Sequence, residues 1–262
     1  RRSPGDGPMT AGTTVVVGAA HGIGAAIARR VAQEPWTSRL VLAGLSDGRM
    51  QELATALQRD DLPVDVVHVD LADEASIAAL VAASQQAERV AISAGIYSSA
   101  AALDTTRAEI ESVLAVNLFG VFFTAQGYAR EMVKRRSGSI VAIGSISGRF
   151  PRLGQVAYGV AKAGMRQALR ILAMETVPQG VRINLISPGP TESDMLHKLM
   201  ADHPSVDDLA NGDLSTFRPA VPDAHVGRPE QVAAATAFLL SPDAAHIAFH
   251  DLYIDGGETL GV

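Results

Sequence analysis

The chain of 262 residues is long enough for one large domain or two small ones, and its 47% hydrophobic and 19% charged residues are ordinary for a folded globular protein. A formal net charge of −6 gives no sign of binding to nucleic acid or to an acidic membrane surface. The absence of cysteine excludes disulfides, thiol catalysis and cysteine metal sites, and no spacing of the histidines predicts a metal site.

Two segments of the chain bear on targeting and on membrane insertion. Residues 1–9 are rich in proline and glycine and lack the apolar core of a signal peptide, so we interpret them as a disordered leader before a single domain at 10–262. The apolar stretch VLAVNLFGVFFTAQGYA is interrupted by Asn117, Gly120 and Gln126 and falls short of the ~20 apolar residues of a membrane span. We expect a buried helix there and no membrane insertion.

Strand-like and helix-like segments alternate along the chain. Short β-branched or apolar runs predict strands at 13–17, 39–44, 63–69, 89–95, 139–144, 181–187 and 251–255. Helical periodicity predicts helices at 22–34, 47–60, 73–86, about 106–135, about 155–177 and from Pro229 onward. The alternation predicts an α/β fold: one doubly wound (Rossmann) sheet of about seven parallel strands with helices on both faces.

One long segment lacks a regular pattern. Residues 190–228 are interrupted by prolines, glycines and charges. A loop of this length in a compact domain is usually functional, so we expect a lid.

The first predicted strand runs into the sequence GAAHGIG at the start of a helix. Gly18, Gly22 and Gly24 permit a tight turn and a close approach of phosphate to the backbone. The helix N-terminus offers free N–H groups and the positive end of its dipole. The sequence therefore predicts a dinucleotide site.

Tyr158 and Lys162 are four residues apart in a predicted helix and leave the same face. A lysine ammonium beside a phenol favours the phenolate, so we expect a lowered tyrosine pKa and proton exchange near neutral pH.

Five sequence motifs occur in a recognisable order: VGAAHGIG, AVNLFG, IGSISG, YGVAK and SPGPTESDM. In this order, over residues 10–262, the chain resembles the short-chain dehydrogenase/reductase family. The resemblance implies that Tyr158 is the general acid/base and that Ser145 hydrogen-bonds the reacting oxygen. It also implies that Lys162 holds the ribose and lowers the tyrosine pKa, and that Asn117 holds a water that relays protons from Lys162.

The resemblance also implies a nicotinamide cofactor and assigns the residues that would bind it. These are Gly18, His21, Gly22, Ile23, Gly24, Asp70, Leu71, Ala94, Gly95, Tyr158, Lys162, Pro188, Gly189, Thr191 and Ser193. The chain departs from the family pattern at Val17, where Thr is usual, and after the fourth strand, where the family's NNAG is here ISAG, Ile92 to Gly95.

Cofactor choice is read at the end of the second strand, in LAGLSDGR. Gly44 or Leu45 occupies the discriminating place, Asp47 is within reach of a ribose and Arg49 of a phosphate. These residues leave NAD and NADP open, with NAD slightly favoured by the resemblance below.

Within the family, the segments PRLGQVAYGVAKAG, SPGPTESDM and DLYIDGGETLGV are most similar to the 2,3-dihydro-2,3-dihydroxybenzoate dehydrogenases of siderophore pathways. The resemblance implies oxidation of a cyclic dihydrodiol carboxylic acid to an aromatic product, and an amino-hydroxy acid would suit the same site. We expect Arg152 to bind the carboxylate and Met195 to begin the lid.

Two other functions are compatible with the sequence. A 3-oxoacyl-[acyl-carrier-protein] reductase would use NADPH and a basic surface, for which Lys134, Arg135 and Arg136 are candidates. A non-catalytic nucleotide-sensing protein is expected to lack Tyr158 or Lys162. The family further implies a cytoplasmic homotetramer packed through Asp104–Arg136 and Gln155–Val177, with a small-molecule substrate and no metal.

Overall fold

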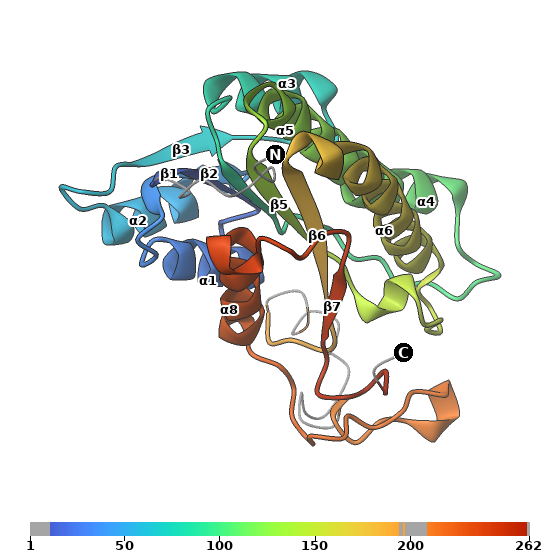
Figure 1. Cartoon of the computed structure of the whole chain (residues 1–262). Helices are drawn as coiled ribbons and strands as arrows, with labels where there is room; N and C mark the ends of the chain where they lie inside the picture. The colour runs from blue at the N-terminus through green and yellow to red at the C-terminus, as the bar shows by residue number, and fades with distance from the viewer. Residues whose placement is uncertain (1–10, 194–195, 197–208, 261–262) are drawn as a thin grey trace.

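The computed structural model describes residues 11–193, 196 and 209–260. The expected leader at 1–9 lies outside these described residues. Within them, seven strands form one sheet in the order β3-β2-β1-β4-β5-β6-β7, and every neighbouring pair is parallel (Figure 1). The predicted fold class is confirmed. The strands are β1 (Gly12–Val17), β2 (Thr37–Gly44), β3 (Val64–His68), β4 (Arg89–Ile92), β5 (Gly138–Ile143), β6 (Val181–Pro188) and β7 (Asp251–Ile254).

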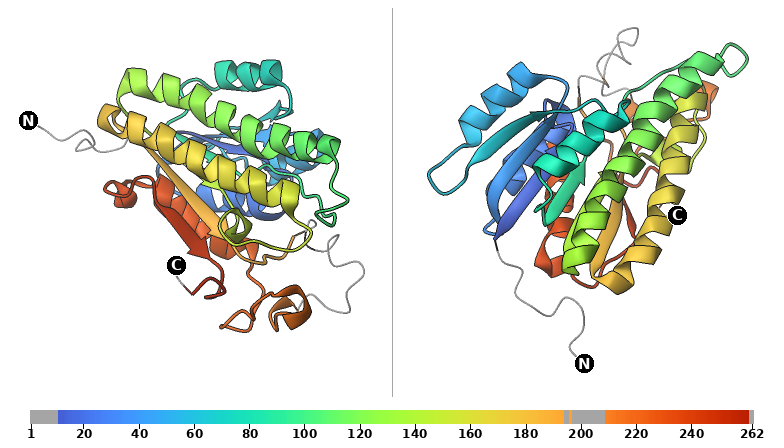
Figure 2. Two further views of the ribbon diagram at one scale, coloured as in Figure 1. Left: turned by 90° about the vertical axis from the view of Figure 1, so that its right-hand side faces the viewer. Right: turned by 90° about the horizontal axis from the view of Figure 1, so that it is seen from above.

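Helices cover both faces of the sheet (Figure 2). They are α1 (Gly22–Val31), α2 (Asp47–Leu57), α3 (Glu74–Ala83), α4 (Arg107–Leu114), α5 (Val121–Arg135), α6 (Val156–Thr176) and α8 (Pro229–Leu240). β1 shows why two layers form: Val15 and Val17 belong to the core under α3, α5 and α6, whereas Val16 belongs to the core over α1, α2 and α8. A strand that is apolar on both sides is thus buried by helices on both sides.

The strand order reverses next to β1, which has β2 on one side and β4 on the other. The connections after these neighbouring strands diverge to opposite sides of the sheet and leave a crevice at their carboxyl ends. The fold therefore places its ligand site beside Gly18 and Ser93, which follow β1 and β4.

The long helix expected at about 106–135 is interrupted. α4 begins with a capping box between Thr106 and Glu109, and α4 and α5 are separated by a π-helical turn at Ala115–Gly120. By composition and length, Arg107–Arg135 is also apolar enough to cross a membrane. Val121, Tyr128 and Met132 are buried in the core. Only 33% of the most apolar window of this segment is buried, however, and Phe119 is 51% exposed, so the expected buried helix is buried on one face only.

The opposite, amino-terminal end of the sheet holds a buried arginine. The Arg89 guanidinium lies over the Trp36 ring at 4.7 Å and donates through Nη1 to the Trp36 carbonyl oxygen at 2.9 Å. Burial lowers the pKa of Arg89 to about 10. Trp36 is only 7% exposed. This pair closes the end of the sheet away from the crevice.

Candidate active site

The glycine loop has the conformation that its residues predict. Gly18 has φ +82°, and a side chain there would meet the Ala94 backbone nitrogen at 2.6 Å. A side chain at Gly24 would collide with the Gly18 carbonyl oxygen. α1 has no acidic residue in its first turn, and its N-cap His21 makes no side-chain cap. The N–H groups and positive dipole end of α1 are therefore available to a pyrophosphate.

A cavity of about 470 Å³ extends from this loop across the carboxyl ends of the strands. The residues expected at the cofactor and catalytic positions line it together, with the exception of Asn117. They are Gly18, His21, Gly22, Ile23, Gly24, Asp70, Leu71, Ala94, Gly95, Ser145, Tyr158, Lys162, Pro188, Gly189, Thr191 and Ser193. Met195 lies outside the described residues.

Tyr158 and Lys162 leave α6 on one side, as expected, and Ser145 follows β5. The Lys162 Nζ atom lies 5.7 Å from the centre of the Tyr158 ring. Burial raises the pKa of Tyr158 to about 12, although a hydrogen bond with Ser145 acts in the opposite direction. The expected lowering of this pKa by Lys162 is therefore not seen in these residues, because desolvation of the phenolate dominates.

Lys162 is itself almost completely buried, with 4% exposure, and donates from Nζ to the Ile143 carbonyl oxygen at 2.9 Å. Burial lowers the pKa of Lys162 to about 8. A lysine whose pKa lies near neutrality can exchange a proton at the pH at which most proteins work.

Asn117 lies behind the cavity wall in the π-helical turn and is fully buried. Its Oδ1 accepts from the Ile96 N–H at 2.8 Å, and its Nδ2 donates to the Ile96 carbonyl oxygen at 2.7 Å. A side chain at Gly95 would come within 3.2 Å of Asn117 Oδ1 and 3.7 Å of Lys162 Nζ. The amide thus fixes the loop after β4 beside the lysine, and the proton relay stays a prediction.

The two departures from the family pattern face each other. Val17 in β1 and Ile92 in β4 are register partners, and both are buried in the same core. The usual polar pair, Thr and Asn, is thus replaced by two apolar side chains that satisfy each other by packing. The change leaves no buried polar group unpaired at these two positions.

The end of β2 presents no charged side chain to the cavity, because the lining residues there are Gly44, Leu45 and Ser46. Asp47 instead contacts His68, with 3.1 Å between Oδ1 and Nδ1. The geometry at this point leaves the choice between NAD and NADP open.

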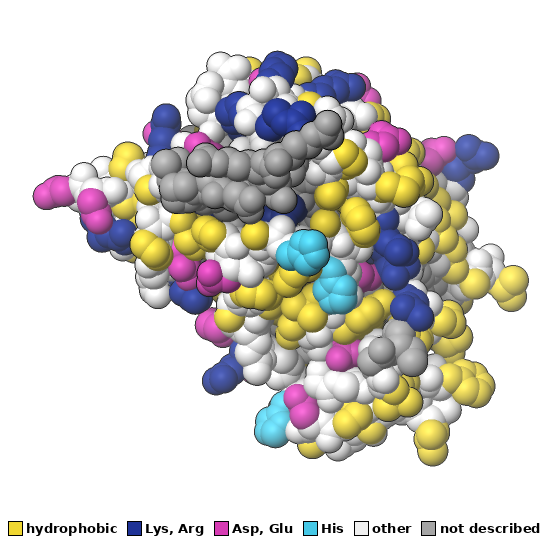
Figure 3. Space-filling model, in the orientation of Figure 1, with side chains coloured by type: hydrophobic (Ala, Val, Ile, Leu, Met, Phe, Trp, Pro, Cys, Tyr) yellow, Lys and Arg dark blue, Asp and Glu magenta, His cyan; other side chains and the backbone are white. Residues whose placement is uncertain are grey.

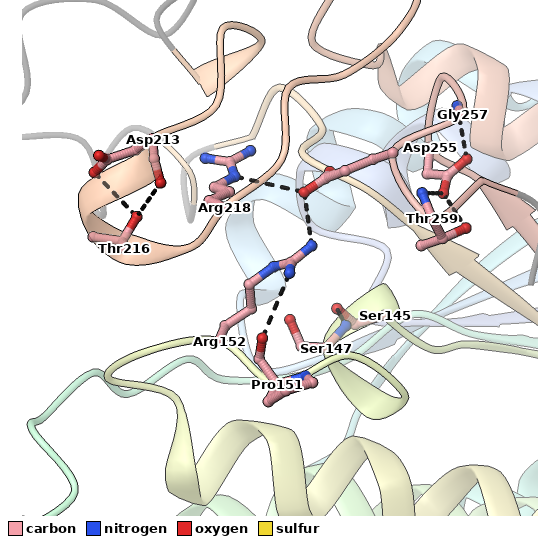
Figure 4. Close-up of polar contacts among 11 residues, drawn as sticks. Ser145, Ser147, Pro151, Arg152, Asp213, Thr216, Arg218, Asp255, Gly257 and Thr259 are labelled. Atoms are coloured by element: carbon pink, nitrogen blue, oxygen red, sulfur yellow. Dashed lines mark hydrogen bonds and ion pairs between the residues drawn. The ribbon is translucent and has the colours of Figure 1, made fainter.

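Arg152 lines the cavity as expected but is already paired. Its Nη2 donates to Oε1 of Glu258 at 2.8 Å, a contact drawn as a dashed line from Arg152 in Figure 4. The side chain of Glu258 is fully buried. Arg218 approaches the same oxygen through Nε at 3.6 Å. Sequence reasoning missed Glu258 and Arg218, and also Tyr97, whose ring lies 5.2 Å from that of Tyr158. Glu258 stands in the quoted tail DLYIDGGETLGV, but no pattern there signalled its role.

Comparisons with known proteins show the family to which the chain belongs. Residues 18–259 match the sequence model of the family described as enoyl-(acyl carrier protein) reductase. The 2,3-dihydro-2,3-dihydroxybenzoate dehydrogenase of Bacillus subtilis is 31% identical, over 94% of this chain and 95% of the relative. The vibriobactin-specific enzyme of the same description from Vibrio cholerae is 33% identical over 94% and 95%.

Solved structures extend the agreement to three dimensions. Levodione reductase superposes with a TM-score of 0.87 at 26% identity, over 97% of this chain and 99% of that one. A second structure is described as a putative NAD(P)-dependent gluconate 5-dehydrogenase from Beutenbergia cavernae with bound NADP. It superposes with a TM-score of 0.86 at 27% identity, over 97% of this chain and 100% of that one.

The chain belongs to the short-chain dehydrogenase/reductase family. It is an NAD(P)-dependent oxidoreductase that acts on alcohol or ketone substrates. The glycine loop and the N-terminus of α1 fit the pyrophosphate of such a cofactor, which, when bound, exchanges a hydride with the substrate.

Proposed function

We propose that this enzyme oxidises a ring alcohol of a cyclic dihydrodiol carboxylic acid resembling 2,3-dihydro-2,3-dihydroxybenzoate. In this proposal the phenolate form of Tyr158 would accept the proton of the hydroxyl, and a bound NAD⁺ would supply the acceptor for the hydride of the carbinol carbon, which leaves a ketone. Tautomerisation of that ketone yields an aromatic ring, and aromaticity favours the oxidative direction.

The observation that carries this proposal is the meeting of Ser145, Tyr158 and Lys162 in the cavity that begins at the glycine loop. In this proposal Ser145 orients the reacting oxygen. Lys162 Nζ is held by the Ile143 carbonyl beneath it. The dihydroxybenzoate class of substrate is supported by relatives of that description over nearly the whole chain. We infer a role in siderophore or related secondary-metabolite biosynthesis on the same ground, with NAD as the cofactor.

The test is direct. Purified protein is mixed with NAD⁺ or NADP⁺ and with 2,3-dihydro-2,3-dihydroxybenzoate, its 2-amino counterpart or a neutral cyclohexadiene diol, and reduced nicotinamide is followed by absorbance. We expect turnover with NAD⁺ and the ring acids, with formation of the aromatic acid. Turnover of 3-oxoacyl thioesters with NADPH, and none of ring acids, would contradict the proposal.

The basic segment considered for the carrier-protein alternative lies away from the cavity. Lys134, Arg135 and Arg136 end α5 just before β5 and so lie at the amino ends of the strands, whereas the cavity opens at their carboxyl ends. Arg135 also donates to the Gln85 and Ala87 carbonyl oxygens, and Lys134 contacts Glu131. This basic segment is therefore not placed to deliver a carrier-bound acyl chain to Tyr158.

We further propose a cytoplasmic homotetramer that binds neither nucleic acid nor membrane. Lys and Arg side chains are interspersed with Asp and Glu side chains on the face that Figure 3 shows. The formal net charge of −6 supports the part of this proposal that concerns nucleic acid. On the two long helical segments, Phe119, Val160, Ile171 and Met174 are each 45–64% exposed. Such an apolar surface supports an interface between copies of the chain.

Assembly is tested by analytical ultracentrifugation. Wild-type protein should sediment at four times the chain mass of 27.4 kDa, and Ile171→Asp/Met174→Asp should dissociate it because two charges would be buried unpaired at the interface. Phe238→Asp, on α8 and 44% exposed, is the matched control and should stay assembled. A monomeric wild-type protein would refute the proposal.

A further inference from the structure

Three charged side chains that line the cavity meet one another. Arg152 comes from the loop after β5, Arg218 from the described part of the expected lid, and Glu258 from the segment after β7. Their side chains are 14%, 17% and 0% exposed, so all three are largely removed from water. In Figure 4, dashed lines run from the guanidinium groups of Arg152 and Arg218 to one carboxylate oxygen, which is Oε1 of Glu258.

The charges of this cluster do not cancel. Two guanidinium groups face one carboxylate, which leaves one positive charge in a poorly hydrated place. Lys162, the other Lys or Arg side chain that lines the cavity among the described residues, donates to the Ile143 carbonyl oxygen. An excess buried charge is stable only when a partner of opposite sign compensates it. The cavity therefore favours a ligand that carries one negative charge.

The two arginines differ in the number of hydrogen-bond donors that remain available to a ligand. Arg152 bonds Glu258 through Nη2 and approaches the Pro151 carbonyl oxygen through Nη1 at 3.5 Å. The Arg218 Nε lies 3.6 Å from Glu258, too far for a hydrogen bond, and among the described residues its other nitrogens bond nothing. Arg218 thus keeps its planar pair of donors, which matches a carboxylate.

The carboxylate of Glu258 also has one oxygen without a hydrogen-bond partner in the described part of the chain. Its Oε2 is buried and has no hydrogen-bond partner among the described residues. The atom lies near Gly189, at which a side chain would approach Oε2 to 3.5 Å. A buried acceptor without a partner is uncommon and points to a donor supplied from outside the chain.

We propose that Arg218 binds the carboxylate of the substrate, in a two-arginine site in which Glu258 neutralises Arg152. This deepens the proposed function and rests on it, because it names the group that recognises a ring acid. It also moves this task from Arg152 to a residue of the lid. Acid recognition and placement of the lid over the substrate thereby use one side chain.

The test measures binding of two product-like ligands, 2,3-dihydroxybenzoate and catechol, to the NAD⁺-loaded enzyme by calorimetry. The ligands differ only in the carboxylate. Arg218→Met should weaken the acid about 10- to 100-fold, as expected for a lost charge-assisted contact, and leave catechol unchanged. Arg218→Lys should have an affinity for the acid between those of wild type and Arg218→Met, because it keeps the positive charge but loses the paired donors of the guanidinium group. Arg228→Met, an exposed arginine of the same segment outside the cavity lining, is the control and should bind both ligands as the wild type does.

Arg152 needs a balanced variant. Arg152→Met alone would leave Glu258 buried without its nearest cation and would destabilise the fold, so it is combined with Glu258→Gln. The double variant keeps one positive charge, on Arg218, and should retain the preference for the acid. Loss of that preference in the double variant, or equal weakening of acid and catechol by Arg218→Met, would overturn the proposal.

Failure of the proposed function gives a different result. If the wild type oxidises no ring acid but still binds 2,3-dihydroxybenzoate through Arg218, the anion site stands and the reaction assignment falls. If ring acids are oxidised equally by wild type and Arg218→Met, the reaction stands and this site falls.

Discussion

Tyr158 is the residue on which the proposed proton transfer depends. Tyr158→Phe keeps the ring and its packing but removes the phenol oxygen that takes up the proton, so turnover should fall on the order of 10²–10⁴-fold. NAD⁺ affinity should hardly change. Steady-state kinetics and cofactor titration measure both quantities.

The matched control is Tyr97→Phe, which alters a neighbouring phenol on the cavity wall. Its turnover should fall far less. If Tyr158→Phe works at close to the wild-type rate, Tyr158 has no part in proton transfer.

Lys162 shows that function opposes stability at this site. Burial lowers the pKa of Lys162 from 10.5 to about 8, so the unfolded chain binds this proton more tightly than the folded protein does. Burying the charged lysine therefore lowers the free energy of unfolding below about pH 8. This loss disappears as the pH rises from about 8 to 10.5 and the buried lysine becomes neutral. Lys162→Met should therefore be more stable than wild type near pH 7, on the order of 3 kcal/mol, while losing activity. The gain should shrink as pH rises from about 8 toward 10.5.

Urea unfolding at several pH values measures this difference. Lys134→Met, at an exposed ion pair with Glu131, is the control and should show no such trend. A stability difference between Lys162→Met and wild type that is independent of pH would contradict the assigned burial cost.

At the scale of elements, the pairing of β1 with β4 sets the floor of the cofactor site. Val17→Thr alone buries a hydroxyl without a partner and should lower the free energy of unfolding by about 1–3 kcal/mol. Combined with Ile92→Asn, its register partner, the loss should be smaller than the sum of the single losses by about 0.5–3 kcal/mol. Denaturant unfolding of all four proteins measures this coupling.

Val15→Thr combined with Ile92→Asn is the control, because Val15 pairs with Val90 and not with Ile92. Strictly additive losses in the Val17 and Ile92 pair would mean that these side chains do not act on each other, and that the joint departure from the family pattern is coincidental.

At the scale of the whole molecule, the segment 190–228 is predicted to act as a lid. Its described residues Pro190, Thr191, Ser193, Leu196, Leu209 and Arg218 line the cavity. We expect hydrogen exchange in 209–228 to slow when NAD⁺ and 2,3-dihydroxybenzoate are both bound, because ordering of a loop protects its amides. Peptides from β5 serve as the reference and should not change. Equal hydrogen exchange of 209–228 in free and bound protein would contradict the prediction of a lid.

The sequence predicted the elements whose signals are local. The apolar runs of the strands, the glycine loop and the spacing of Tyr158 and Lys162 each depend on neighbours a few residues away. Glu258 could not be found in this way, because its partner Arg152 is 106 residues distant and only the fold brings them together. The direction of the Tyr158 pKa was wrong for a related reason: charge can be read from the sequence, but the degree of burial cannot.

The chain has one tryptophan, Trp36, and its place over Arg89 has a spectroscopic consequence. The indole is buried at the amino-terminal end of the sheet, whereas the cavity lies at the carboxyl-terminal end. Its fluorescence should therefore shift to longer wavelength when the sheet unfolds and stay unchanged when NAD⁺ binds. The molecule thus carries an intrinsic optical reporter that responds to unfolding and is silent to ligand, so stability and binding can be followed in one sample.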